Sequence, residues 1–252
     1  MRNRYLYNKI AQDRYKLLAE LEKQRNSKII TLVGISPASS LNIEASGKIV
    51  ENLRRLESNQ DIEIFIHTIG GDLDAGWRIA NEILYREGST SVIVTELAKS
   101  TGTLISLAAT RVIARPQAEF GPVDPYIQVR RREREVSLPA LELTESEDEL
   151  EKISAQTALT RSRERLMTIL QERLEKTEEE RNEVAKILLR EDVNPAERSH
   201  FFPINPHYLL DLGFDIQIDA LTKFCELYSL YLNDPKRESL ERGSHLVEML
   251  PV

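Results

Sequence analysis

Short apolar runs alternate with amphipathic segments along the first half of the chain. The runs are rich in β-branched residues, which predicts buried strands at residues 28–35, 62–67, 91–95 and 111–116. Apolar residues at helical spacing predict helices between them, at residues 43–56, 73–86 and 99–109. The last of these helices consists almost entirely of small and apolar residues, so we expect it to be buried on all sides. Strands that alternate with helices in this way predict an α/β fold with a parallel sheet.

The second half of the chain has a different character. A mostly charged stretch at residues 130–136 is expected to be exposed, and residues 144–190 contain neither Gly nor Pro. Capping-box patterns at 146–149 and 177–180 predict two helices there, with a break near Lys176. The alternating charges of this region are typical of a solvated helical face.

Amphipathic segments also stand near both ends of the sequence. Residues 5–25 predict an N-terminal helix that packs against a neighbour, and residues 201–218 predict a last helix–strand unit. Another amphipathic helix is expected over 220–232. Residues 234–252 are rich in Pro and charge, and we expect a flexible tail with a small docking segment.

Composition narrows the class of protein. The 252 residues carry 34 basic and 41 acidic side chains, a net charge of −7, which argues against nucleic-acid binding. No apolar run approaches the roughly 18 residues that a membrane-spanning helix needs, and the first residues do not form a signal peptide. The single cysteine, Cys225, excludes a disulfide framework, and we expect it to be a core thiol. These features predict a soluble protein of a reducing cytoplasm, without metal or cofactor.

Two motifs at strand-to-helix junctions could carry chemistry. Gly70-Gly71 follows one predicted strand, and glycines there let the backbone approach a ligand closely. Ser100 opens the buried small-residue helix, where free N–H groups stabilise a developing oxyanion. Taken singly, the glycines could form a plain turn and the serine a helix cap. Because ligands bind at the carboxyl ends of parallel strands, the pair together predicts an acyl-transfer site.

Four sequence blocks resemble the serine dehydrogenase proteinase family, a branch of the Clp-peptidase/signal-peptide-peptidase/crotonase-like superfamily. They are ITLVG, FIHTIGGDLDAGWRIANEI, VIVTELAKSTGTLISLAATRVIARPQAEFGPVDPYI and SHFFPINPHYLLDLGF, and they occur in the family's order within residues 27–218. Family members typically read H-T-P-G-G, S-A-G-T and G-P-I-D-P. The chain has His67–Gly71, Ser100–Thr103 and Gly121–Pro125 at the corresponding places.

The resemblance implies a crotonase-like (Clp-peptidase-like) α/β core of repeated ββα units. It also implies Ser100 as the nucleophile and the N–H groups of Gly71 and Thr101 as the oxyanion hole, with Gly70 and Gly102 as supporting loop residues. Retained hydrolysis in Ser100→Ala would refute the first of these roles.

The identity of the general base stays open at this point. Clp peptidases use a histidine that follows the serine, but the corresponding segment, Gly121–Pro125, contains none. Signal peptide peptidases use a lysine further on, and Lys152 lies in that region. His200 matches a histidine of the family and lies near the position of the Clp triad aspartate. A histidine is suited to proton transfer near neutral pH, so we favour His200 over Lys152.

Other polar residues are assigned structural roles. Lys99 is adjacent to Ser100 and is expected to point away from it, and His67 is expected to pack beside the Gly-Gly loop. Asp124 lies beside two prolines and is expected to fix a turn or a contact between subunits rather than to bind metal. His207 follows a proline at a helix start and is expected on the surface.

We therefore expect a serine peptidase that hydrolyses peptides or unfolded proteins through an acyl-enzyme. Residues 1–26 would form an N-terminal helix, 27–218 the Clp-like domain with a helical arm at about 138–195, and 219–252 a C-terminal helix and tail. The resemblance also implies a homo-oligomer and allows an unfoldase or regulatory partner. Two alternatives stay open: a catalytically inactive Clp-like scaffold, favoured by Thr101 and Phe201 where the family has an alanine and an acidic residue, and a crotonase-type acyl-thioester enzyme.

Overall fold

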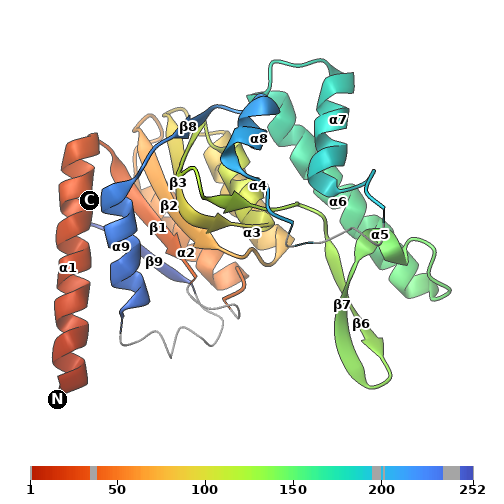
Figure 1. Cartoon of the computed structure of the whole chain (residues 1–252), viewed down its shortest axis with the longest axis horizontal. Coiled ribbons are helices and arrows are strands. Elements are labelled where there is room, and N and C mark those ends of the chain that lie inside the picture. The colour runs from red at the N-terminus through yellow and green to blue at the C-terminus, as the bar shows by residue number, and fades with distance from the viewer. Residues whose placement is uncertain (1, 35–38, 195–199, 201, 235–244, 252) are drawn as a thin grey trace. The chain divides into compact units, whose positions relative to one another are not determined.

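The central element is a seven-stranded sheet. The computed structural model describes residues 2–34, 39–194, 200, 202–234 and 245–251. Within these residues the strand order is β8-β4-β3-β2-β1-β9, with β5 paired to the end of β3 (Figure 1). The strands are β1 (Lys28–Val33), β2 (Ile62–Thr68), β3 (Thr90–Ala98), β4 (Arg111–Ala114), β5 (Glu119–Phe120), β8 (Ile216–Ile218) and β9 (Leu246–Met249). Only β9 is antiparallel to its neighbour, β1; the other pairings are parallel.

Helices cover both faces of this sheet. One face is covered by α2 (Ile43–Arg55), α3 (Leu73–Leu84) and α4 (Thr101–Ala108), and the other by α1 (Arg2–Arg25) and α9 (Thr222–Leu232), as Figure 1 shows. The short helix α8 (Pro206–Asp211) precedes β8. Asn42 and Asp72 cap α2 and α3, since their side chains accept hydrogen bonds from the third residue onward, Ala45 and Ala75.

Because side chains alternate along each strand, the apolar core is divided between the two faces of the sheet. Residues one apart face opposite sides of a sheet, so alternate apolar residues of each strand meet different helices. The core under α1 and α9 contains Leu17, Leu18, Leu21, Ile29, Val33, Phe65, Ile93, Ile113, Phe224, Leu227 and Tyr231. On the other side α4 is buried along its whole length, as its composition predicts.

A buried ion-pair network joins the two ends of the sequence. Arg14 on α1 is 2% exposed and pairs with Asp234, just after α9, and with Glu248 on β9, at 2.8 Å. The hydroxyl of Tyr231 donates to the same Glu248 carboxylate at 2.7 Å. This network ties α1, α9 and β9 together beneath one face of the sheet.

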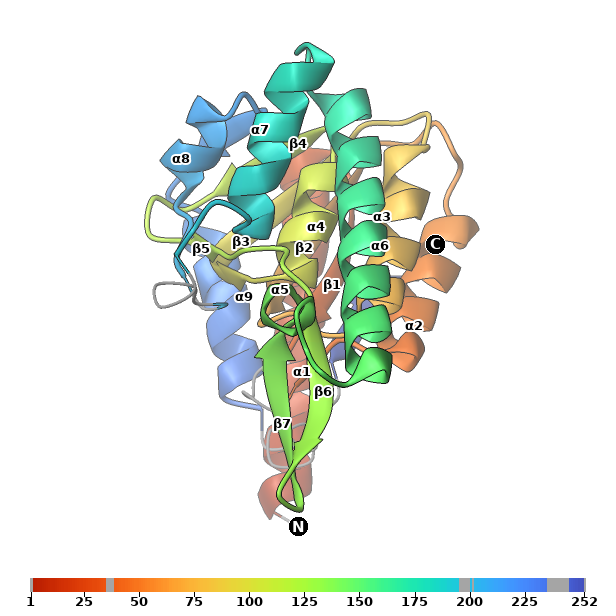
Figure 2. The same ribbon diagram turned by 90° about the vertical axis from the view of Figure 1, so that its right-hand side faces the viewer.

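Residues Gly121–Ile204 form a second compact unit, distinct from the unit of Met1–Phe120 and Asn205–Val252. It begins with a hairpin of β6 (Tyr126–Arg131) and β7 (Arg134–Pro139). Arg132 and Glu133 form its turn, both with positive φ. The hairpin leads into α5 (Ala140–Leu143), α6 (Glu149–Arg173) and α7 (Glu178–Leu189), of which α6 and α7 pack side by side (Figure 2).

Most predicted elements are confirmed, with differences that have physical causes. The break before α7 and its capping box are present, since Thr177 and Glu180 satisfy each other's backbone N–H groups. The cap of α6 is Asp148 rather than Ser146, whose hydroxyl instead donates to Glu151. Cys225 is only partly buried, so the prediction of a core thiol was wrong.

Some predictions fall outside the described residues, among them residues 235–244 of the expected tail and Phe201. The docking segment that was expected at the end of the tail is β9. In the described ranges, none of the helices combines the length and the apolar character needed to cross a membrane.

Candidate active site

Ser100 occupies a strained turn between β3 and α4. Its backbone has φ +51° and ψ −116°, a region that residues other than glycine rarely adopt. The serine stands at the cap position of α4, but its hydroxyl makes no capping hydrogen bond, so the interpretation as a plain helix cap is wrong. A strained strand-to-helix turn of this kind presents a nucleophilic hydroxyl in α/β hydrolases.

The Gly70-Gly71 loop lies directly against this serine. β2 and β3 are neighbours, and Thr68 pairs with Ala98 where the two strands end. A Cβ added to Gly70 would lie 2.7 Å from the Cβ of Ser100 and 3.3 Å from its Oγ, so only glycine fits there. Gly70 also has φ +102°, which glycine adopts without strain. The sequence prediction that the two motifs meet is therefore confirmed.

Two backbone N–H groups beside the serine lack protein partners among the described residues. The Gly71 bridge to Leu41 uses the Gly70 carbonyl, which accepts from Leu41 at 2.7 Å, and the Asp72 N–H, which donates to the Leu41 carbonyl at 2.8 Å. Because the residues on either side of Gly71 make both bonds of this parallel bridge, the N–H of Gly71 itself points away from Leu41. Thr101 is the first residue of α4, where helix N–H groups have no acceptor within the helix. These are the two donors that the family resemblance assigns to the oxyanion hole.

Close packing explains the small residues around the turn. A Cβ added to Gly102 would lie 2.5 Å from Cγ2 of Thr68, so α4 lies directly on the end of β2. The Thr101 side chain packs on Gly76 of α3, where an added Cβ would lie 2.7 Å from the Cβ of Thr101. Gly102 therefore leaves room for the Thr68 side chain against α4, and does not itself offer a reactive group.

Lys99 is turned away from the reaction site. Its ammonium is buried and pairs with the Glu119 carboxylate on β5 at 2.6 Å. Glu119 lies on β5, directly before the second unit, and the ion pair fixes Lys99, the residue before Ser100. This agrees with the structural role expected for Lys99, although sequence reasoning did not identify Glu119.

His200 forms a pair with Asp124 in the second unit. The His200 Nδ1 lies 2.8 Å from Oδ1 of Asp124, and its ring contacts Tyr126 with 4.5 Å between ring centroids. Asp124 is buried, and its Oδ2 has no hydrogen-bond partner within the described part of the chain. A carboxylate that accepts from Nδ1–H leaves Nε2 as a proton acceptor.

Sequence reasoning missed this pair. The two residues lie 76 positions apart, and Asp124 was expected only to fix a turn or a subunit contact. A signal was present, because Asp124 stands in the segment where Clp peptidases have their histidine, and His200 lies near the place of their aspartate. The two residue types are exchanged between these positions.

The remaining candidates are one lysine of the second unit and two histidines of the first unit. Lys152 is on α6 in the second unit, partly exposed, and among the described residues its ammonium pairs with no carboxylate. His67 is buried at the end of β2, 3.1 Å from the Tyr228 hydroxyl, and burial lowers its pKa to about 4. His207 is exposed on α8, as expected.

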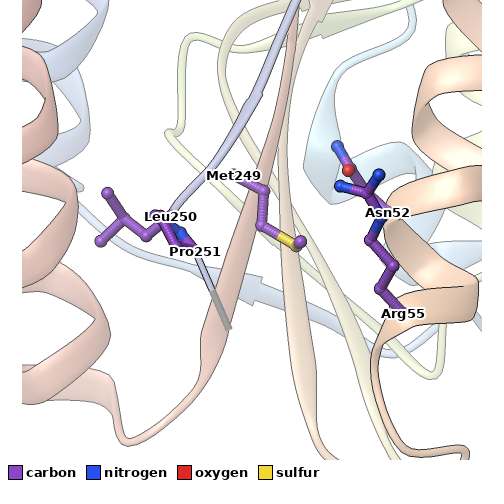
Figure 3. Close-up of a pocket in the computed structure, with 5 residues that line it drawn as sticks. All are labelled: Asn52, Arg55, Met249, Leu250 and Pro251. Atoms are coloured by element: carbon purple, nitrogen blue, oxygen red, sulfur yellow. The ribbon is translucent and has the colours of Figure 1, made fainter.

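A cavity of about 530 Å³ lies at the edge of the sheet, away from Ser100. It is lined by Asn52, Arg55, Met249, Leu250 and Pro251. Figure 3 shows the Met249 thioether turned toward α2 and Leu250 turned the opposite way. Met249 pairs with Ile30 near the amino end of β1, whereas Ser100 follows the carboxyl end of β3. The cavity is thus separate from the serine turn.

Several known proteins are similar in sequence to this chain. Two uncharacterised proteins of Methanocaldococcus jannaschii are similar to this chain: MJ0137 is 29% identical over 97% of the chain and 85% of its own length, and MJ1495 is 28% identical over 86% and 76%. The ATP-dependent Clp protease proteolytic subunit 2 of Treponema denticola is 29% identical over 55% of the chain and 69% of its own length.

Structural comparison supports the fold. The 1510-N membrane-bound stomatin-specific protease, solved as a serine-to-alanine mutant, superposes with a TM-score of 0.52 at 14% identity, over 75% of this chain and 79% of its own. At that identity the likeness concerns the fold alone, which is a Clp-peptidase-like α/β fold. The model of the ClpP-like SDH-type serine proteinases matches residues 1–252, and the chain belongs to that family.

Proposed function

We propose that this protein is a serine peptidase that hydrolyses peptide bonds in peptides or unfolded polypeptides through an acyl-enzyme at Ser100. The backbone of Ser100 is the observation that carries the proposal. Strain at a residue other than glycine costs on the order of 1–3 kcal/mol and persists where function requires it. Here it lifts the hydroxyl out of a capping position and places it against Gly70.

In the first half of the reaction, Ser100 Oγ attacks the carbonyl carbon of the scissile peptide. The new C–O bond forms as the hydroxyl proton passes to the base, and the oxyanion is held by the N–H groups of Gly71 and Thr101. Each such donor contributes roughly 3 kcal/mol to lowering the barrier. The base then protonates the amine nitrogen as the C–N bond breaks, which leaves an ester on Ser100.

In the second half, water attacks the ester carbonyl. The base takes a proton from the water, and the returning Ser100 oxygen receives it as the ester C–O bond breaks. The products are a carboxylic acid and the free hydroxyl, so the enzyme is regenerated.

We assign the base to His200, oriented by Asp124. The 2.8 Å contact to Asp124 supports this assignment, because a carboxylate on Nδ1 fixes the tautomer whose Nε2 accepts a proton. Lys152 has no such partner and is the second choice. The His200 that serves a given Ser100 can belong to the same chain or to another copy.

Labelling with a fluorophosphonate probe tests the proposal. We expect one modified residue, located by mass mapping at Ser100 and absent in Ser100→Ala. The matched control Ser229→Ala, at an exposed serine on α9, should label normally. A folded protein that does not react would contradict the peptidase assignment and favour the inactive scaffold.

The base is tested with the same probe. His200→Ala and Asp124→Asn should lower the labelling rate by about 100-fold or more, as loss of general-base catalysis does. Lys152→Ala should leave the rate unchanged. The reverse order of effects would move the assignment to Lys152.

We further propose that the protein acts in the cytoplasm as a homo-oligomer, with an unfoldase or regulatory protein as its partner. Exposed apolar side chains on α6, Leu150 and Ile153, support a contact between copies. A sedimentation mass equal to that of one chain at micromolar concentration would refute the oligomer. If such a contact brings two sites together, mixing Ser100→Ala with His200→Ala would restore activity.

A further inference from the structure

His245 lies close to the Gly70-Gly71 loop that packs against Ser100. His245 precedes β9, which pairs with β1 so that Leu246 lies opposite Val33. Gly34, the residue after β1, lies against the His245 imidazole, because a Cβ added to Gly34 would be 2.8 Å from Nε2 of His245. The side chain is 4% exposed, and burial lowers its pKa to about 4, so the ring is neutral near neutral pH.

A threonine hydroxyl connects this histidine to the glycine loop. His245 Nε2 lies 2.8 Å from Oγ1 of Thr68, and the same oxygen accepts the N–H of Gly70 at 3.1 Å. A hydroxyl can accept from Nε2–H or donate to a bare Nε2 while it accepts from Gly70. Both tautomers of His245 therefore keep the bridge intact.

The bridge ends at the Gly70 N–H, one peptide unit before the N–H that the proposed reaction uses. Gly70 contacts Ser100, and its carbonyl is fixed by the Leu41 N–H at 2.7 Å. The peptide unit between Gly70 and Gly71 carries the N–H assigned to the oxyanion hole. A displacement of about 1 Å in such a group costs on the order of 100-fold in rate, so whatever fixes this peptide affects catalysis.

The bridge is separate from the contacts that anchor β9. Glu248 binds Arg14 and Tyr231 on the opposite side of the strand, without contact to Thr68. The Nδ1 of His245 is buried and has no hydrogen-bond partner within the described residues, so Thr68 is the group that its ring engages there.

We propose that His245 is a positioning residue of the oxyanion hole, which acts through Thr68 and the Gly70 N–H to fix the loop that carries the Gly71 N–H. This inference rests on the proposed function for its catalytic consequence, whereas the positioning itself is a property of the loop. The far end of the sequence thereby contributes to a site built from β2 and β3.

The experiment combines two readouts on His245→Ala, His245→Gln and the control Glu248→Gln. Hydrogen exchange followed by mass spectrometry reports the amides of residues 68–72, and the fluorophosphonate labelling rate reports the reactivity of Ser100. We expect His245→Ala to speed exchange at Gly70 and to slow labelling, each by roughly tenfold, as loss of one hydrogen bond predicts. His245→Gln, whose amide can still reach a hydroxyl, should recover part of both losses.

Glu248→Gln separates positioning from the docking of β9. It should lower the thermal midpoint without changing exchange at Gly70 or the labelling rate. Hydrolysis of labelled casein should show a lower kcat with an unchanged KM in His245→Ala. Unchanged exchange in His245→Ala, or equal effects in Glu248→Gln, would overturn the inference. Faster exchange in a protein that never labels would instead uphold the positioning role and refute the proposed peptidase function.

Discussion

Replacing either buried histidine by glutamine is expected to weaken the acid sensitivity of this protein's stability. His67 and His245 are 6% and 4% exposed, and burial lowers the pKa of each from 6.5 to about 4, with a further contribution at His67 from the charge of His245. Each ring therefore binds a proton more weakly in the folded than in the unfolded chain. Their stabilising contribution is complete above about pH 6.5 and is lost as the pH falls toward about 4.

The magnitude follows from protonation linkage. Between about pH 7 and pH 5, the protonation of each histidine in the unfolded chain lowers the free energy of unfolding by about 2 kcal/mol, and the two together lower it by about 4 kcal/mol. Urea unfolding at these two pH values, followed by circular dichroism, measures the difference directly. His67→Gln and His245→Gln should each reduce the wild-type difference by about 2 kcal/mol.

The exposed histidine of α8 supplies the control for this measurement. His207→Gln should keep the wild-type difference between the two pH values, because its ring is in water in both states. If both buried-site variants lost as much stability in acid as the wild type does, the two rings would not be buried in neutral form, and the reasoning would fail.

Three further predictions follow from single contacts. Arg14→Met leaves the buried carboxylate of Asp234 and the partly buried carboxylate of Glu248 without their cation and should cost about 3–5 kcal/mol in urea unfolding, whereas Arg54→Met, at an exposed pair, should cost under about 1 kcal/mol. Thr177→Ala removes the capping box of α7 and should cost about 1 kcal/mol by the same assay; no change would mean that the cap is not formed in solution. Gly70→Ala brings a Cβ to 2.7 Å from the Cβ of Ser100 and should slow fluorophosphonate labelling by about 100-fold or more, while Gly47→Ala, with its nearest neighbour at 3.8 Å, should not; equal rates would contradict the close approach.

The sheet and its helices were predictable because their residues carry a clear hydrophobic period. The runs that became β1 to β4 are buried, α2 and α3 bury one face each and α4 is buried along its whole length, so local pattern and tertiary packing agree. The β6–β7 hairpin was missed for the opposite reason. Most of its side chains are exposed and residues 130–135 are all charged, and its turn uses Arg132 and Glu133 at positive φ where glycine or asparagine would have signalled a turn.

The candidate site was predictable only in part. Ser100 and the Gly-Gly loop could be found because both follow predicted strands, and neighbouring parallel strands end at the same edge of the sheet. The partnership of His200 with Asp124, and that of His245 with Thr68, join residues 76 and 177 positions apart. The hydrophobic pattern of a sequence cannot predict such pairs, because side chains far apart along the chain meet only after the fold has formed.

The ion pairs of Arg14 have a consequence for the order in which the chain folds. Arg14 lies 220 positions from Asp234 and 234 positions from Glu248, so its buried cation has no carboxylate partner until these distant segments have joined the sheet. Until then α1 would have to bury an unpaired charge to pack on the sheet, which is strongly unfavourable. The layer of α1 and α9 is thus completed late in folding, because α1 can pack on the sheet without an unpaired charge only when both distant carboxylates are in place.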